Sequence, residues 1–135
     1  MADNWNDSII AEFRANGGKV GGPFEGATLL LLHSTGAKSG RPRITPVMTF
    51  DLDGKQLIVG SYAGADHDPA WLHNLRADPH ARIEIGTDSY DVQAFELPQE
   101  ERDAAYARIV EQAPGFGEYQ EKTTRVIPVV ELRRR

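Results

Sequence analysis

The stretch from Leu29 to Phe50 constrains the fold of this chain most, because it places a basic loop between two apolar runs. Leu29–Leu32 is an uninterrupted apolar run that is too short for an ordinary helix, which predicts a strand buried on both faces. The residues that follow are rich in serine, glycine and proline, and they include Lys38, Arg41 and Arg43. The sequence therefore predicts two strands joined by a cationic loop.

The charge of this loop is opposite to that of the whole chain, whose formal net charge is −5. A local excess of cations favours an anionic ligand, because guanidinium groups and exposed backbone N–H groups bind phosphate oxygens. A solvated hairpin end with incidental cations is the alternative. We do not expect nucleic acid as a partner, since aromatic side chains do not alternate with the basic ones. The order of glycine and lysine in residues 36–40 also differs from that of a nucleotide-binding P-loop.

The length of 135 residues is that of one domain able to bury a core without metal or disulfide. We expect a single domain over residues 1–135, with an N-terminal helix and a glycine-rich connector in residues 1–25. The chain has no cysteine, which excludes disulfides and fits a reducing compartment, so we expect a cytoplasmic protein. The acidic N-terminus argues against a signal peptide, and no apolar run approaches the roughly 20 residues of a membrane span.

The first helix is predicted over Asp3–Asn16, where Trp5, Ile9, Ile10 and Phe13 share one face. This face needs a surface to cover. Docking onto the body of the domain or onto a neighbouring subunit is one interpretation, and peripheral contact with a membrane is another.

The other strands are expected where apolar residues alternate between turn signals. They are residues 44–51, 56–62, 81–86, 89–97 and 126–132. The closing Arg133–Arg135 is interpreted as a solvated end. About six mainly antiparallel strands with flanking helices indicate an α+β domain on a curled sheet, for which a small barrel is the natural closure.

Three further helices are expected after the third strand. One begins with Asp68 as N-cap and Pro69 at its first position. A longer one opens at Pro98, with Arg102 on its water-facing side. A short one covers residues 117–124.

Familiar catalytic patterns are missing from the sequence. The four histidines are scattered and form no metal-binding spacing, so we expect no metal site. None of the serines stands in a G-x-S-x-G setting, which argues against a hydrolase nucleophile. The sequence therefore offers none of the familiar sets of catalytic residues.

The segment Thr35–Arg43, followed by Pro46, resembles the signature of the deazaflavin-dependent nitroreductase family, which uses coenzyme F420. The similarity continues in Gly64–Pro69 and Trp71, and in the last predicted strand at Thr124–Val129. It covers nearly the whole chain. This resemblance implies a split β-barrel of the FMN-binding-like type.

The resemblance also implies roles for individual residues, which are carried over position by position. The phosphate and acidic tail of F420 would be held by Lys38, Ser39, Gly40 and Arg43. Pro46 and Met48 would lie beside the deazaflavin ring, and Trp71 and Asn74 near the cofactor pocket. For Trp71, plain core packing is the equal alternative.

The implied reaction is hydride transfer from reduced F420 to an electron-poor small molecule. Ser61 would donate a hydrogen bond to the acceptor, and Tyr119 would be a proton donor or a pocket wall. Phe116 and Tyr62 depart from the family pattern, the first because it cannot donate a proton and the second because relatives have a basic residue there. Activated enones such as quinones or coumarins therefore fit better than nitroaromatics.

Two alternatives to this reductase stay open at the level of sequence. The chain could bind F420 or a hydrophobic ligand without turnover, or it could use FMN as other split barrels do. The acceptor, the proton donor and the choice between monomer and homodimer are not fixed by the sequence.

Overall fold

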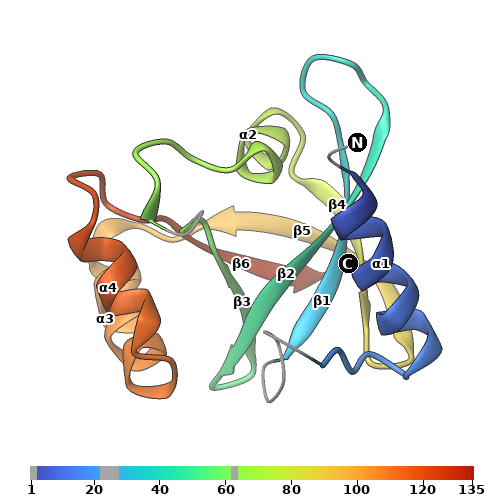
Figure 1. Cartoon of the computed structure of the whole chain (residues 1–135). Coiled ribbons are helices and arrows are strands. Elements are labelled where there is room, and N and C mark those ends of the chain that lie inside the picture. Colours follow the sequence, from blue (N-terminus) through green and yellow to red (C-terminus); the bar gives the residue numbers. More distant parts are fainter. Residues whose placement is uncertain (1–2, 22–27, 62–63) are drawn as a thin grey trace.

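The computed structural model describes residues 3–21, 28–61 and 64–135 (Figure 1). The predictions for the side chain of Trp5 and for Tyr62 lie outside the described part. The elements in chain order are α1 (Asp3–Ala15), β1 (Leu29–Thr35), β2 (Pro42–Leu52), β3 (Lys55–Val59), α2 (Ala70–Ala77), β4 (His80–Ile85), β5 (Asp88–Glu96), α3 (Gln99–Gln112), α4 (Gly115–Glu121) and β6 (Val129–Arg134).

The six strands form one closed barrel in the order β1-β2-β3-β6-β5-β4, and every described pairing is antiparallel. The barrel closes where Leu31–His33 of β1 pair with Arg82–Glu84 of β4. Asp53 and Gly54 form the tight β2–β3 turn, both with positive φ, which the sequence pair Asp-Gly favours. The predicted α+β barrel of six antiparallel strands is confirmed.

The interior of the barrel is filled by alternate residues of the strands, including Leu30, Leu32 and Ile83, which are fully buried. Helix α2 lies over one end of the barrel (Figure 1) and adds Trp71 and Leu72 to the same cluster. Burial of this apolar surface fixes α2 against the barrel, since each fully buried large side chain contributes about 2 kcal/mol.

The outer faces of the strands pack against the remaining helices. Helices α3 and α4 cover β2, β3 and β6 through a cluster that contains Phe50, Ile109 and Phe116. Helix α1 covers β1, where Phe13 is 1% exposed and packs with Leu31. Both faces of β1 are therefore buried, as its uninterrupted apolar run predicts. Docking on the barrel accounts for Ile9, Ile10 and Phe13 on the apolar face of α1.

Two predicted details of the helices are wrong. Pro69, not Asp68, is the N-cap residue of α2, and it makes no side-chain cap bond. The carboxylate of Asp68 instead pairs with Arg76 and Arg125 at 2.7 and 2.9 Å. Arg102 does not face water, because its side chain is only 11% exposed and donates to the carbonyl of Ile127.

Several strand ends also differ from the prediction. Strand β3 ends at Val59, so Ser61 lies in the following loop. Strand β6 begins at Val129 and continues through Arg133 and Arg134. These two arginines are not a free tail, since their guanidinium groups lie 4.0 and 4.3 Å from the ring centres of Phe95 and Tyr90. Paired backbone and cation–π contacts extend the strand.

Candidate cofactor site

The basic loop between β1 and β2 is closed by its own backbone. The N–H of Gly36 donates to the carbonyl of Arg41 at 2.8 Å, and the N–H of Gly40 donates to the carbonyl of Gly36 at 2.9 Å. Gly40 has φ +68°, a conformation that glycine adopts without strain. At Gly36 a Cβ would lie 2.5 Å from the hydroxyl of Ser39, so a larger residue there would displace this hydroxyl. The glycines thus shape a tight turn that presents the side chains between them.

Helix α2 holds this loop from the side. The side-chain oxygen of Asn74 accepts a hydrogen bond of 2.9 Å from the backbone N–H of Ala37. Because Trp71 and Leu75 of the same helix are buried in the barrel core, the position of Asn74 is fixed by packing. The loop is therefore tied to a rigid element.

A cavity of about 480 Å³ lies between the loop and α2. It is lined by Gly36, Ala37, Lys38, Ser39, Arg43, Thr45, Ala70, Trp71, His73 and Asn74. These residues include two permanent cations and no carboxylate. Hydroxyl and amide groups add neutral hydrogen-bonding partners, so the cavity suits an anion that carries several oxygens.

Five of the eight predicted cofactor residues meet in this cavity, namely Lys38, Ser39, Arg43, Trp71 and Asn74. Gly40 shapes the loop but does not line the cavity. Trp71 belongs to the barrel core at 7% exposure and also borders the cavity, while its contact with a cofactor stays a prediction.

The other two predicted cofactor residues lie on the opposite face of β2. Side chains alternate along this strand, and Arg43 and Thr45 face the cavity. Ile44 and Met48 pack toward α1 on the outer face, and Pro46 lies between them in the alternation. The structure therefore separates the predicted ring contacts from the predicted tail contacts by the thickness of one strand.

The two predicted catalytic residues do not line this cavity, but they flank one loop. The N–H of Gly64 donates to the carbonyl of Ser61 at 2.9 Å. A Cβ on Gly64 would lie 2.9 Å from the carbonyl oxygen of Tyr119. The rings of Tyr119 and Phe116 pack edge-on, with their centres 5.5 Å apart. Tyr119 and Met48 both pack against the cluster under α3 and α4 that contains Phe116. Ser61, Tyr119 and Met48 therefore belong to the α4 side of the barrel.

Sequence reasoning missed some of the lining residues. Thr45 follows from the two-residue alternation that places Arg43 in the cavity. His73 is exposed, stands next to Asn74 on α2 and adds an imidazole to the lining. Ala70 lines the cavity from the first position of α2, and no sequence signal indicated this.

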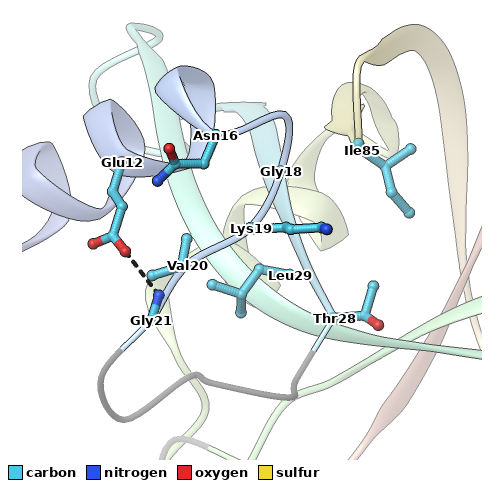
Figure 2. Close-up of a pocket in the computed structure, with 10 residues that line it drawn as sticks. Glu12, Asn16, Gly18, Lys19, Val20, Gly21, Thr28, Leu29 and Ile85 are labelled. Carbon is cyan, nitrogen blue, oxygen red and sulfur yellow. Dashed lines mark hydrogen bonds between the residues drawn. The ribbon is translucent and has the colours of Figure 1, made fainter.

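A larger cavity of about 980 Å³ lies near the C-terminal end of α1 and contains none of the predicted site residues (Figure 2). Lys19, Val20 and Leu29 are among its lining residues. Figure 2 shows the carboxylate of Glu12 reaching the backbone N–H of Gly21, a bond of 2.7 Å. This contact holds the end of α1 against the segment that follows it.

The described residues contain no group of three or more histidine, cysteine or acidic side chains that could hold a metal ion. Within the same residues, no helix has the length and apolar character required to cross a membrane.

Comparison with known proteins connects this geometry to a family. The family model described as F420H(2)-dependent quinone reductase matches residues 6–133. An F420H(2)-dependent quinone reductase of Mycobacterium tuberculosis is 40% identical over 132 residues, covering 93% of this chain and 87% of the relative.

Solved structures give the same result. The F420-H2 dependent reductase FDR-A has a TM-score of 0.70 and 38% identity, covering 78% of this chain and 93% of its own. A structure described as a domain-swapped dimer has a TM-score of 0.72 and 32% identity, covering 98% of this chain and 100% of its own. The expected split-barrel fold is confirmed by these similarities. The chain thus belongs to the F420H(2)-dependent quinone reductase family, and the prediction of an oxidoreductase that uses reduced coenzyme F420 is confirmed.

Proposed function

We propose that this protein transfers a hydride from reduced F420 to quinones and related activated enones. The observation that carries the proposal is the cavity between the basic loop and α2, in which Lys38 and Arg43 face a common space without a carboxylate. The phosphate and oligoglutamate tail of F420 are anionic, so the lining fits this part of the cofactor in sign and in hydrogen-bonding capacity. FMN has a phosphate but no such tail, which makes it the weaker candidate.

The residues divide into a tail-binding part and a ring-binding part. Lys38, Ser39 and Arg43 would hold the phosphate and tail, with the loop shape maintained by Gly36, Gly40 and Asn74. His73 would add a further polar contact from α2. Pro46 and Met48 would form the wall for the ring on the outer face of β2.

When bound, reduced F420 supplies the hydride, and the protein has to align the acceptor and exclude water. The hydroxyl of Ser61 would donate a hydrogen bond to the acceptor oxygen. The backbone of Ser61 is fixed because its carbonyl accepts a hydrogen bond from the N–H of Gly64. Tyr119 would close the acceptor side or donate a proton. The phenol keeps its place through edge-on packing against Phe116, which is buried and has no proton to donate.

The acceptor class follows from the apolar character of this side. Met48 and Tyr119 border a cluster of buried aromatic and aliphatic side chains. Flat apolar molecules such as quinones, coumarins and furanocoumarins suit such a wall, whereas nitroaromatic reduction would depend on the single phenol of Tyr119. We place the reaction in the cytoplasm, since the cysteine-free sequence fits a reducing compartment.

The test is a titration followed by turnover. F420 should bind more tightly than FMN or than the deazaflavin chromophore without its tail, and added salt should weaken the F420 complex most. Reduced F420 should then be oxidised only when menadione or a coumarin is present. Tight binding without oxidation by any of several acceptors would contradict the proposal and would favour a binding protein.

A further inference from the structure

Arg125 lies in the segment between α4 and β6, and its side chain is only 16% exposed. Its guanidinium group binds three different parts of the chain before α2. The contacts are Nε to the carbonyl of Ala65 at 2.8 Å, Nη1 to the carboxylate of Asp68 at 2.9 Å, and Nη2 to the carbonyls of Gly60 and Ser61 at 3.1 and 2.8 Å. Such a set uses nearly every N–H of one arginine, which lysine cannot reproduce.

The contact with Asp68 continues into α2. Asp68 also accepts from Arg76 at 2.7 Å, and Arg76 donates two bonds of 2.9 and 3.0 Å to Glu96 at the end of β5. The hydrogen bonds to Glu96 and Asp68 raise the pKa of Arg76, which therefore stays charged. Through Asp68 and Arg76, the loop before α2 is thus connected to the last turn of this helix and to the end of β5.

The backbone of the segment that carries Arg125 is held from the other side. The amide of Gln120 on α4 donates to the carbonyl of Arg125 at 2.7 Å and accepts from the N–H of Ile127 at 3.0 Å. Arg102 of α3 donates to Gln120 and to the carbonyl of Ile127 at 2.6 and 2.8 Å. The bonds of Gln120 therefore fix the backbone at Arg125, while Arg102 supports the neighbouring Ile127.

We propose that Arg125 is a positioning residue, which fixes the loop before α2 and thereby sets the place of Trp71 and Asn74 relative to the basic loop. The same contacts fix the backbone of Ser61 through its carbonyl. The side chain of Arg125 thus helps to fix the positions of both parts of the site, which are the tail cavity at α2 and the acceptor side at Ser61. This inference rests on the proposed cofactor cavity.

The test compares Arg125→Lys with the matched variant Arg102→Lys. Each variant removes a guanidinium group from an arginine whose side chain is less than a fifth exposed. Arg102 differs from Arg125 in having no bond to the loop before α2. In Arg125→Lys we expect faster hydrogen–deuterium exchange of residues 64–77 in the cofactor-free protein. We also expect a rise of about tenfold in the Kd and KM for F420 and a fall of about threefold in kcat, because the carbonyl of Ser61 loses its contact as well.

Arg102→Lys should lower the melting temperature as well, with faster exchange of residues 120–129. Because Gln120 keeps its own bonds to the backbone of Arg125 and Ile127, the exchange of residues 64–77 should not change and the Kd for F420 should stay within about twofold of the wild-type value. A purely structural role predicts equal changes of Kd in the two variants. That result, or unchanged exchange of residues 64–77 in Arg125→Lys, would overturn the inference.

Two further variants keep the outcome decisive. If Arg125→Lys does not fold, Asp68→Asn removes the carboxylate that joins Arg125 to Arg76 and leaves the three carbonyl contacts of Arg125. It should raise the Kd and the exchange of residues 68–77, and unchanged values would count against the inference. Lys38→Ala tests the cavity itself: an unchanged Kd there overturns the proposed function, while exchange in the cofactor-free protein still decides the role of Arg125.

Discussion

Asn74 of α2 accepts a hydrogen bond of 2.9 Å from the backbone N–H of Ala37, and this single bond joins the helix over the barrel end to the basic loop. The loop presents Lys38 and Ser39 to the cavity immediately after this bond. The side chain of Asn74, which lies outside the loop, therefore helps to fix both the conformation of the loop and the shape of the cavity.

Asn74→Ala should loosen the loop and weaken F420 binding by about fivefold, since a tethered backbone N–H is lost. Hydrogen–deuterium exchange of residues 36–41 and a fluorescence titration measure the two effects. Asn74→Asp keeps an oxygen acceptor, so the loop should stay protected while the added negative charge still weakens binding. Equal exchange in all three proteins would contradict the role of this bond.

Lys38→Ala and Arg43→Ala should each weaken F420 binding by about tenfold, or ~1.4 kcal/mol, because each removes a charged contact to an anion. The loss should shrink as salt rises, since salt already screens the attraction in the wild type. Arg41→Ala is the matched control, because Arg41 belongs to the same loop and does not line the cavity. Binding that falls equally in all three variants would indicate a general charge effect.

Gly36→Ala should leave the fold stable and weaken F420 binding. The new methyl group would meet the hydroxyl of Ser39 at 2.5 Å, and this flexible side chain can move away at little cost. The hydroxyl would then leave the position in which it accepts from the N–H of Arg41 at 3.2 Å. Gly115→Ala, where no atom lies within 4 Å of the added Cβ, controls for the loss of a glycine. The check is the melting temperature together with the Kd.

Ser61→Ala and Tyr119→Phe should lower kcat with menadione by about tenfold or more and leave the Kd for F420 unchanged, because both residues lie outside the tail cavity. Single-turnover oxidation of pre-reduced F420 separates this step from product release. Should Tyr119→Phe keep full activity while Tyr119→Ala loses it, the tyrosine acts as a wall and not as a proton donor.

Glu84→Gln should destabilise the docking of α1 in a pH-dependent way. The hydrogen bond from Arg14, at 2.7 Å, and the contact with His33 lower the pKa of Glu84 from 4.5 to about 2. A lowered pKa stabilises the folded state above the unfolded value, so the contribution is complete above pH 4.5 and is lost as the pH falls toward 2. Because Arg14 is half exposed, we expect about 1 kcal/mol, or about 4 °C in Tm.

Thermal unfolding of wild type and Glu84→Gln at pH 7 and near pH 2 checks this prediction. The difference in Tm should be present at pH 7 and absent near pH 2. Asp91→Asn is the control, since the pair of Asp91 and Arg82 is about half exposed on both sides and should contribute little. A difference that does not change with pH would show that packing, and not charge, stabilises this contact.

The barrel and much of the tail site were predictable because local signals determine them. The apolar run of Leu29–Leu32 and the turn at Asp53-Gly54 fix strands with little help from distant residues. The basic loop is a local motif as well, and helical spacing places Trp71 and Asn74 on one helix. The prediction of F420 as cofactor came from the resemblance to a family and not from the pattern of apolar and charged residues.

Other features were beyond the sequence because they depend on contacts between distant segments. Asp68 has the usual character of an N-cap residue, but Arg76 and Arg125 each bind one of its carboxylate oxygens. Arg102 lies on a polar position of α3, and its side chain is largely covered because it bonds to Ile127 in the segment before β6. The placement of Pro46 outside the cavity follows from strand pairing, which fixes the face of every residue on β2.

The closed order of the six strands has a consequence for assembly. Each described strand has a neighbour on both sides, because β4 returns to pair with β1. A second protein therefore finds no strand of the described barrel with a wholly free side. Among the described residues, the longest stretch of backbone left for strand addition is the side of residues 42–48 in β2 that does not face β1, since β2 pairs with β3 only over residues 49–52. Partners that do not pair with this stretch have to recognise side-chain surfaces or exchange a whole segment. Most of the sheet is thus protected from the strand pairing that promotes aggregation.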